Sequence, residues 1–153
     1  MNPDYKIRQG EPKDFEAVID MIKELALFEK APEQVINTVE RMHEEQDLFG
    51  LLVVEHKGEV VAMALYFYAY FTWVGKSMYL DDLYVKEAHR GQGIGQALID
   101  EIFEIAKKEN CCRVRWQVLD WNQPAIDLYG KIGANLDKEW INCDFDREAI
   151  LNY

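Results

Sequence analysis

The amino-acid sequence predicts an α+β domain built on a mixed, largely antiparallel sheet flanked by helices. Segments of strand composition and of helical periodicity follow one another in the order β α α β β β α β α β. The three consecutive β-rich segments have no helix between them, and strands joined by short turns pair antiparallel. A length of 153 residues with 49% hydrophobic residues fits one domain, residues 1–153, that needs no disulfide or metal to stabilise its core.

The first three elements are a strand and two helices. Residues 5–8 predict a short opening strand. From Lys13 the hydrophobic residues recur at helical spacing, and Pro32 ends this helix. Its apolar face consists of Phe15, Val18, Ile19, Ile22, Leu25 and Ala26. A polar, weakly amphipathic stretch, residues 38–45, predicts the second helix, although Thr38 and Arg41 do not form a capping box.

The middle of the chain predicts a hairpin and a third strand. Residues 51–55 and 60–70 are rich in strand-forming residues, and the short turn between them contains Gly58, which is typical of a β-hairpin. The third β-rich run, residues 78–85, follows Gly75. These three strands form the antiparallel centre of the predicted sheet.

The second half predicts an amphipathic helix followed by shorter elements. Residues 94–108 have helical periodicity, and two lysines suit the negative end of the helix dipole. The elements expected after it are a strand at 112–118, a helix at 124–131 that stops at Gly133, a strand around 141–145 and a terminal turn of helix.

Composition excludes several functional classes. The 28 acidic residues exceed the 17 basic ones, giving a net charge of −11, which argues against nucleic-acid binding and favours either a cationic partner or simple solubility. No apolar run approaches the roughly 18 residues of a membrane span, and the N-terminus does not resemble a signal peptide. Cys111, Cys112 and Cys143 have neither disulfide nor metal-site spacing, so we expect buried, reduced thiols in a cytoplasmic protein and no metal.

A glycine-rich segment between a strand and a helix is the strongest local signal. It consists of Arg90, Gly91, Gln92, Gly93, Ile94, Gly95 and Gln96. Glycines permit close backbone approach, so several N–H groups can converge at a helix N-terminus and hold a pyrophosphate, with Arg90 as a cationic donor at the edge. The segment is not a P-loop, which ends in Gly-Lys-Ser/Thr, and it lacks the third glycine of the dinucleotide fingerprint.

A second motif lies downstream, over residues 122–134. Asn122 precedes a helix that has Pro124 in its first turn, so it can act as an N-cap. Tyr129 stands one turn before the end of that helix. Taken alone, a tyrosine at this place is explained by packing against a sheet.

Together the two motifs resemble the GCN5-related N-acetyltransferase (GNAT) superfamily. The glycine segment matches its Arg/Gln-x-x-Gly-x-Gly/Ala loop, and Asn122, Ala125, Tyr129 and Gly133 match its next segment. A closer resemblance is to the diamine (spermidine/spermine) acetyltransferase branch, which also includes enzymes acting on thialysine-like amino acids. Its marks here run over nearly the whole chain and include 23–26, 33–35, 73–76, 79–85 and 120–122.

The resemblance implies acetyl transfer from acetyl-coenzyme A to a primary amine. It assigns the pyrophosphate to the glycine segment, further cofactor contacts to Asn122, Pro124, Ala125 and Tyr129, and polarisation of the thioester to a splayed, bulged strand. That strand is represented here by Leu83, Tyr84 and Val85. Tyr129 matches the family's general acid for the departing thiolate, while the ammonium substrate must lose a proton.

The resemblance also places a small cationic amine against acidic residues. Asp81 and Asp82 are two carboxylates in an apolar strand, where charge is costly unless a cation pairs with it. Where the polyamine enzymes have Glu and Tyr, this chain has Asp81 and Phe28, which leaves the substrate length open. The further expected substrate contacts are Glu29, Leu119, Asp120 and Trp121, with Glu139 as a weaker candidate.

Several interpretations stay open at this point. The leading one is a cytoplasmic polyamine or diamine acetyltransferase, and the alternatives are a thialysine or amino-acid acetyltransferase, a peptide N-terminal acetyltransferase and a noncatalytic coenzyme A-binding module. The family implies a homodimer, with no nucleic-acid or membrane partner. His43, His56 and His89 are scattered along the sequence without ligand spacing, so we expect surface or loop positions for them. The aromatic run 66–71 is explained by core and dimer packing.

Overall fold

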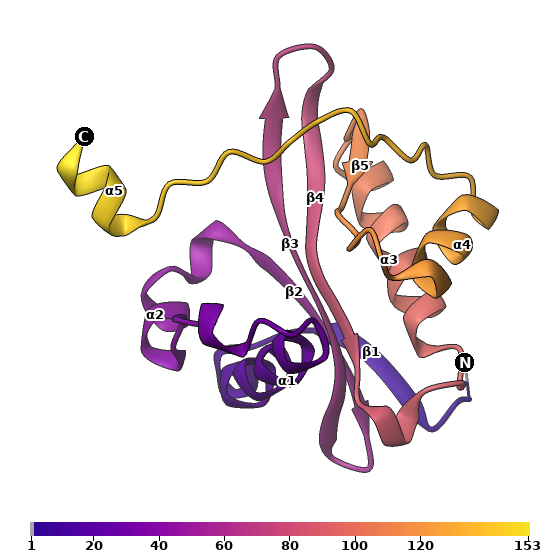
Figure 1. Ribbon diagram of the computed structural model, residues 1–153. Helices are drawn as coiled ribbons and strands as arrows, with labels where there is room; N and C mark the ends of the chain where they lie inside the picture. The colour runs from indigo at the N-terminus through magenta and orange to yellow at the C-terminus, as the bar shows by residue number, and fades with distance from the viewer. Residues whose placement is uncertain (1) are drawn as a thin grey trace. The chain divides into compact units, whose positions relative to one another are not determined.

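The computed structural model describes residues 2–153, which divide into two compact units at the Gln117–Val118 peptide. The first unit contains a sheet and three α-helices, and the second contains two short helices (Figure 1). No helix among residues 2–153 is both long and apolar enough to cross a membrane.

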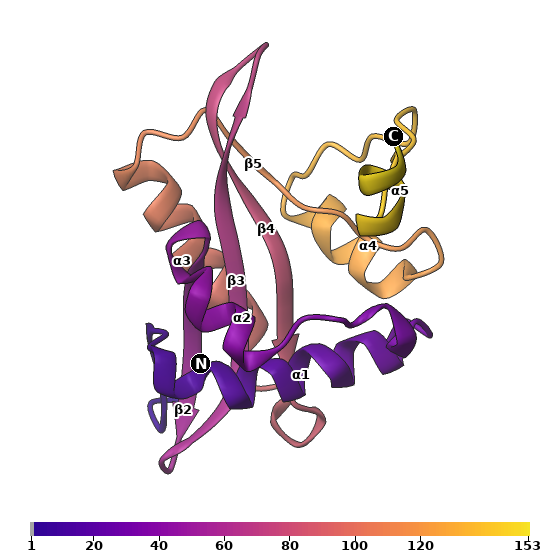
Figure 2. The ribbon, with the colours of Figure 1, turned by 90° about the vertical axis from the view of Figure 1, so that its left-hand side faces the viewer.

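The sheet of the first unit has five strands in sequential order. They are β1 (Tyr5–Gln9), β2 (Gly50–His56), β3 (Glu59–Phe71), β4 (Gly75–Val85) and β5 (Arg113–Arg115). The first three pairings are antiparallel, and β5 joins β4 in parallel. The long β3–β4 hairpin projects beyond the neighbouring strands (Figure 2). The predicted α+β fold with a largely antiparallel sheet is confirmed.

Helices cover both faces of this sheet (Figure 1). They are α1 (Phe15–Phe28), α2 (Val39–Glu44) and α3 (Ile94–Lys108). The α1 core lies between α1, α2 and the sheet and contains Phe15, Val18, Ile19, Met21, Met42, Leu51, Val53, Met63 and Tyr84. The α3 core on the opposite face contains Leu52, Val54, Val61, Ala62, Ala64, Tyr66, Met78, Leu80, Ile94, Leu98, Ile102 and Ala106. Consecutive side chains of a strand point to opposite faces of the sheet, so they pack into the two cores in turn.

Local signals explain where the helices begin and end. Thr38 accepts a hydrogen bond from the Arg41 amide at 3.2 Å, so it caps α2 although no capping box is present. Helix α1 ends at Phe28, before the proline, because Lys30 adopts a left-handed φ of 62°. Helix α3 has the predicted bounds.

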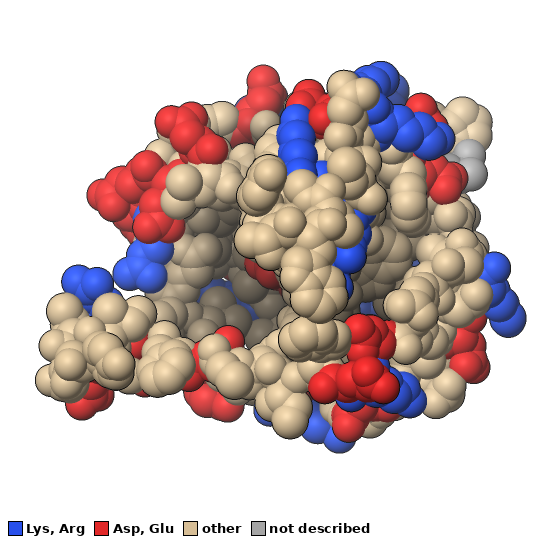
Figure 3. Space-filling model, turned by 90° about the horizontal axis from the view of Figure 1, so that it is seen from above, with Lys and Arg blue, Asp and Glu red and all other residues tan. Residues whose placement is uncertain are grey.

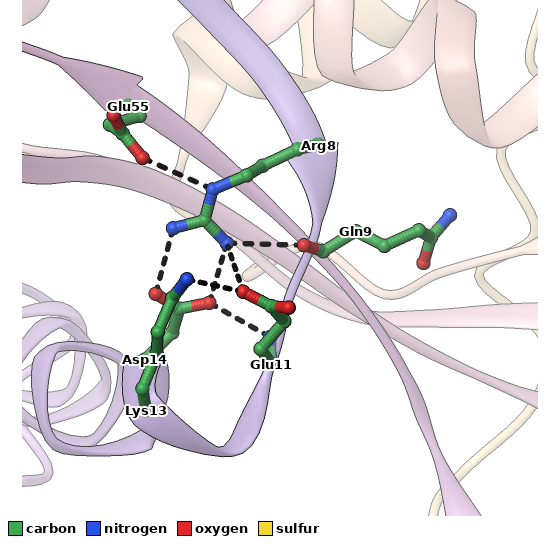
Figure 4. Close-up of polar contacts among 6 residues, drawn as sticks. All are labelled: Arg8, Gln9, Glu11, Lys13, Asp14 and Glu55. Atoms are coloured by element: carbon green, nitrogen blue, oxygen red, sulfur yellow. Dashed lines mark hydrogen bonds and ion pairs between the residues drawn. The ribbon is translucent and has the colours of Figure 1, made fainter.

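Arg8 fastens β1 to the start of α1 and to β2 (Figure 4). Its guanidinium donates to both carboxylate oxygens of Asp14, at 2.7 Å and 2.9 Å, and to Glu55 at 3.1 Å. Asp14 is only 4% exposed and also accepts from the Glu11 amide at 2.8 Å. The bonds from Arg8 hold the pKa of Asp14 below its usual value, and those to Asp14 raise the pKa of Arg8.

The second unit contains α4 (Gln123–Lys131) and α5 (Arg147–Asn152). Gly133 has a φ of 93°, and the Ala134 amide donates to the Tyr129 carbonyl at 2.9 Å, which ends α4 as predicted. The predicted strand at 141–145 is wrong. Its apolar residues alternate, but the segment pairs with no strand of the described chain, and Ile141 and Phe145 are exposed.

Two further expectations need correction. The strand predicted over 112–118 is only Arg113–Arg115, because its pairing with β4 stops at Tyr79. The cysteines are free, but they are not buried: Cys112 and Cys143 are exposed, and Cys111 is half-buried at the end of the α3 region. Only Cys111 packs against a core, that of α3.

Candidate active site

A β-bulge in β4 brings two carboxylates to one face of the sheet. Leu65 of β3 pairs with Asp82, but the next residue of β3, Tyr66, pairs with Leu80, so Asp81 is an extra residue in β4. In a regular strand two consecutive side chains point to opposite faces, whereas at a bulge they share one. Leu80 packs in the α3 core, and both aspartates lie on the α1 side.

Both aspartates line a pocket of about 330 Å³ in the first unit, which we call the acidic pocket. The segment after α1 and the residues around α2 form its other walls. The remaining lining residues are Ile22, Gln34, Val35, Ile36, Asn37, Met42, Glu45, Leu48, Phe49 and Leu65. The walls are therefore largely apolar, and the charged groups are all acidic. Such a pocket suits an aliphatic chain that ends in an ammonium group.

The acidic pocket favours protonation of its own carboxylates. Burial raises the pKa of Asp82 to about 6, and repulsion from Asp81 and Glu29 contributes to the shift. Asp81 is exposed as a residue, yet the protein atoms around its carboxyl raise its pKa as well. A bound cation would reverse this penalty, because an adjacent opposite charge favours the ionised form.

Phe28 and Glu29 lie at the end of α1, outside the walls of the pocket. Phe28 is the last residue of the helix and Glu29 is its C-cap; both are exposed. Partial burial of its carboxyl raises the pKa of Glu29. Since the charge of Glu29 acts on Asp82, Glu29 adds to the negative potential of the pocket without lining it.

Beyond the bulge, β4 is paired on one side only. Leu83, Tyr84 and Val85 pair with residues 62–64 of β3, while β5 contacts β4 only from Ser77 to Tyr79. The second backbone edge of this segment therefore has no strand partner in the described chain. Its amide and carbonyl groups can meet a ligand, as the predicted splayed strand requires.

The glycine segment has the geometry of an anion cradle. Gly91 and Gly93 adopt left-handed φ angles of 74° and 76°, and a Cβ on Gly91 would meet no atom within 4 Å. Gly93 caps α3, so the amides of Ile94, Gly95 and Gln96 have no helical acceptor. The positive end of this 15-residue helix and three free amides fit a pyrophosphate.

Arg90, which directly precedes the cradle, is hydrogen-bonded to the end of β4. Its Nε donates to the Val85 carbonyl at 3.0 Å and its Nη2 donates to the Tyr84 hydroxyl at 3.4 Å. Tyr84, which is 8% exposed, donates in turn to Glu24 of α1 at 2.9 Å. Arg90 thus attaches to the end of β4 while remaining exposed, and its contact with the cofactor stays a prediction.

The second unit contains the other predicted cofactor residues. Asn122 occupies the N-cap position of α4, but its side chain makes no capping bond. Its amide donates to the Leu119 carbonyl at 2.9 Å, closing a turn that contains Asp120 and Trp121. Pro124 and Ala125 follow in the first turn of the helix.

Tyr129 is half-buried in the last turns of α4. Burial raises the pKa of its hydroxyl, so the group stays protonated at neutral pH and can act only as a proton donor there. Glu139 lies in the exposed segment before α5. The roles assigned to these second-unit residues remain predictions.

Sequence reasoning missed most of the walls of the acidic pocket. Gln34, Asn37 and Glu45 come from the segment between α1 and β2, for which the sequence indicated a helix and, at 33–35, a mark of the family resemblance, but no role in a site. The fold alone brings this segment against β4.

The three histidines were expected at surface or loop positions: His43 is exposed and His89 lies in the turn after β4, whereas His56 is the last residue of β2. The ring of His56 stacks on Tyr5 with centroids 4.4 Å apart, and His89 lies 3.2 Å from the Tyr5 hydroxyl through Nδ1. Antiparallel pairing of β1 with β2 brings Tyr5 beside His56. His43 packs against Phe15 at 4.9 Å.

Basic side chains are dispersed on the face of the molecule that Figure 3 shows. Lys and Arg side chains form no continuous patch on the face seen from above, where acidic groups interrupt them (Figure 3). Among residues 2–153 no group of three or more His, Cys, Asp or Glu side chains could hold a metal ion.

Comparison with known proteins gives related acetyltransferases. A thialysine N-epsilon-acetyltransferase of Sus scrofa is 38% identical over 159 residues, which cover 94% of each chain. One of Caenorhabditis elegans is 35% identical and covers 97% of this chain and 96% of that protein. The human spermidine/spermine N(1)-acetyltransferase-like protein 1 is 30% identical and covers 97% of this chain but 23% of its own length.

Solved structures show the same fold at low sequence identity. An integron cassette protein from the mobile metagenome of V. cholerae is 20% identical with a TM-score of 0.77, covering 97% of this chain and 96% of that one. A possible acetyltransferase from Clostridium difficile 630 has a TM-score of 0.76 at 20% identity, covering 94% and 99%. The model of the acetyltransferase (GNAT) family matches residues 15–134. With a family match over most of its length and full-length relatives above 30% identity, the chain belongs to the GNAT acetyltransferases, which use acetyl-coenzyme A.

Proposed function

We propose that this protein transfers an acetyl group from acetyl-coenzyme A to the side-chain amine of a thialysine-like amino acid. The observation that carries the proposal is the full-length similarity to thialysine N-epsilon-acetyltransferases from a mammal and a nematode. The acidic pocket supports it, because Asp81 and Asp82 share one face with apolar walls suited to an aliphatic amine. This replaces the polyamine as the leading substrate.

In the proposed reaction, Asp82 attracts the ammonium group and helps it lose its proton. An alkylamine has a pKa near 10, so it is mostly protonated and not nucleophilic at neutral pH. With a pKa of about 6, Asp82 is ionised at pH 8 yet more basic than an ordinary aspartate, which suits a proton acceptor. The β-thioether of thialysine withdraws electrons and makes its amine easier to deprotonate than that of lysine.

The cosubstrate would lie along the open edge of β4. The amides after Gly93 would hold its pyrophosphate, and the unpaired edge of Leu83–Val85 would polarise the thioester carbonyl. The amine attacks that carbonyl, an amide bond forms, the thioester bond breaks, and the coenzyme A thiolate leaves. Tyr129 is the proposed donor of a proton to that thiolate, since its raised pKa keeps it protonated.

A direct test is release of coenzyme A thiol from acetyl-coenzyme A with a panel of amines. The panel contains thialysine, lysine, ornithine, putrescine, spermidine, spermine and a peptide with a free N-terminus. We expect thialysine to give the highest kcat/KM. Binding of coenzyme A without turnover of any amine would instead support a noncatalytic module and refute the enzyme.

A diamine is the second candidate substrate. The observation in its favour is the acidic pocket, whose lining residues include three acids and no Lys or Arg. A preference for putrescine or spermidine in the same panel would select it. We also propose a homodimer, which light scattering at micromolar concentration would test; a monomer would contradict it.

A further inference from the structure

Two arginines lie without acidic partners on the sheet face that carries the acidic pocket. Arg113 and Arg115 are alternate residues of β5, so they share a face, and Val114 between them packs toward the α3 core. Their guanidinium carbons lie 5.4 Å and 5.0 Å from the ring centroid of Phe71. Among residues 2–153 no carboxylate forms an ion pair with either guanidinium.

The strand register places Arg115 close to the acidic pocket. In the parallel β4–β5 pair Arg115 lies beside Tyr79, which precedes Asp81 by two residues and therefore shares its face. Adjacent strands are about 4.8 Å apart and two strand residues cover about 6.6 Å, so the Arg115 and Asp81 Cα atoms are separated by about 8 Å.

The electrostatics of Tyr79 agree with this placement. Burial is the largest cause that raises the pKa of its hydroxyl; the charge of Asp81 raises it further, and the charge of Arg115 lowers it. Tyr79 thus lies within electrostatic reach of one anionic and one cationic side chain. This face of the sheet therefore carries an acidic side chain, Asp81, and a basic one, Arg115, near the same tyrosine.

The two guanidinium groups are arranged for an anion from outside the chain. Both are half-buried, and they are adjacent like charges in a protein with 28 acids and 17 bases, yet no carboxylate neutralises them. Stacking on Phe71 fixes their planes, which reduces the entropy that a ligand must overcome. A planar guanidinium binds a carboxylate through two parallel hydrogen bonds.

We propose that Arg115 binds the α-carboxylate of the amino-acid substrate, while Asp81 and Asp82 bind its side-chain ammonium group. This rests on the proposed function and narrows its substrate to diamino acids. Thialysine spans about 7–8 Å from its side-chain nitrogen to its carboxylate carbon by standard bond lengths, which is close to the estimated separation of the Arg115 and Asp81 Cα atoms. A polyamine has no anionic group, so Arg115 repels it and disfavours its binding.

A matched pair of acceptors tests the role of Arg115. Thialysine and its decarboxylated analogue, bis(2-aminoethyl) sulfide, carry the same reactive amine and differ in the carboxylate. Arg115→Gln is expected to raise the KM for thialysine by about ten- to hundredfold, as the loss of a charge-assisted bond does. The KM for the analogue is expected to stay unchanged or to fall. Arg115→Lys keeps the positive charge but lacks the planar guanidinium that forms two parallel hydrogen bonds, so it is expected to retain part of the affinity.

Two controls separate this role from a structural one. Arg113→Gln removes the neighbouring charge, beside Ser77 and farther from Asp81, and is expected to have a smaller effect. S-propylcysteine has the α-carboxylate but lacks the side-chain amine that is acetylated. It is expected to inhibit the native enzyme and not the Arg115→Gln variant. The KM for acetyl-coenzyme A is expected to be the same in all variants.

The outcomes distinguish this proposal from the proposed function. Equal losses of Arg115→Gln on thialysine and on its analogue, or no loss on either, would overturn the role of Arg115 while leaving the acetyltransferase intact. A native enzyme that uses only the analogue would do the same. No turnover of any amine by the native enzyme would refute both.

Discussion

Replacement of Asp82 by Asn is expected to stabilise the protein while impairing its reaction. Placing the carboxylate in the acidic pocket raises its pKa from 3.8 to about 6, which at about 1.4 kcal/mol for each tenfold change corresponds to about 3 kcal/mol. The folded state therefore holds this proton more tightly than the unfolded chain. Folding stability falls as the pH rises from about 4 to 6, and the full penalty is present above that range.

Asn keeps the shape of the side chain and removes the charge. We expect Asp82→Asn to increase the free energy of unfolding by about 3 kcal/mol at pH 8 and by about half as much at pH 5, where part of the native Asp82 is already protonated. Urea unfolding followed by tryptophan fluorescence measures both values. The kcat/KM for thialysine is expected to fall by about tenfold or more, because the pocket loses its proton acceptor and one of the two aspartate charges that bind the ammonium group.

Asp20→Asn is the matched control, since Asp20 is exposed on α1 and the same atoms change. Surface substitutions of this kind change stability by about 0.5 kcal/mol or less. An Asp82→Asn protein with native stability at pH 8, or with a gain independent of pH, would refute the reasoning about the buried charge.

Three further predictions concern other parts of the chain. Tyr129→Phe is expected to lower kcat by about a hundredfold with little change in the KM for acetyl-coenzyme A; an unchanged kcat across pH would remove Tyr129 from the mechanism. Asp14→Asn is expected to lower the free energy of unfolding, measured in urea at pH 7, by about 2–4 kcal/mol. Because Arg8 lowers the pKa of Asp14, this difference is expected to shrink only as acid protonates the native carboxylate. Gly93→Ala places a Cβ at a φ of 76° and is expected to lower the free energy of unfolding by about 1 kcal/mol and to raise the KM for acetyl-coenzyme A severalfold. Gly58→Ala, at a φ of 86° in the turn between β2 and β3, is the matched control: it is expected to cost a similar stability and to leave that KM unchanged.

Hydrophobic periodicity predicted the helices and strands whose apolar residues pack into one of the two cores. Helix α3 has the predicted bounds, because five of its residues are buried along one face and its glycine segment marks the start. The hairpin of β2 and β3 was equally clear from its composition and Gly58. The segment 141–145 has the same alternation, but a strand also needs a partner edge, and the pattern alone does not contain that information.

The sequence indicated the kind of ligand that the site binds more clearly than the arrangement of the site residues in space. The residue types of Asp81 and Asp82 indicated a cation site, but alternation alone would place them on opposite faces, and only the family resemblance implied a bulge in this strand. Arg90 was expected at the edge of the pyrophosphate cradle, and the sequence did not indicate that it would also bond to the Tyr84 hydroxyl and the Val85 carbonyl. Such choices depend on neighbours that are distant in the sequence.

The bulge also has a consequence for how the site could be gained or lost during evolution. Leu80 before it and Leu83 after it both pack toward the α3 core, and Tyr84 packs in the α1 core. Deleting the codon for Asp81 would join Leu80 directly to Asp82 and restore regular alternation, with Leu83 and Tyr84 still on their present sides. A single-codon insertion into an ordinary strand is thus sufficient to add the second carboxylate, and it leaves both cores in phase.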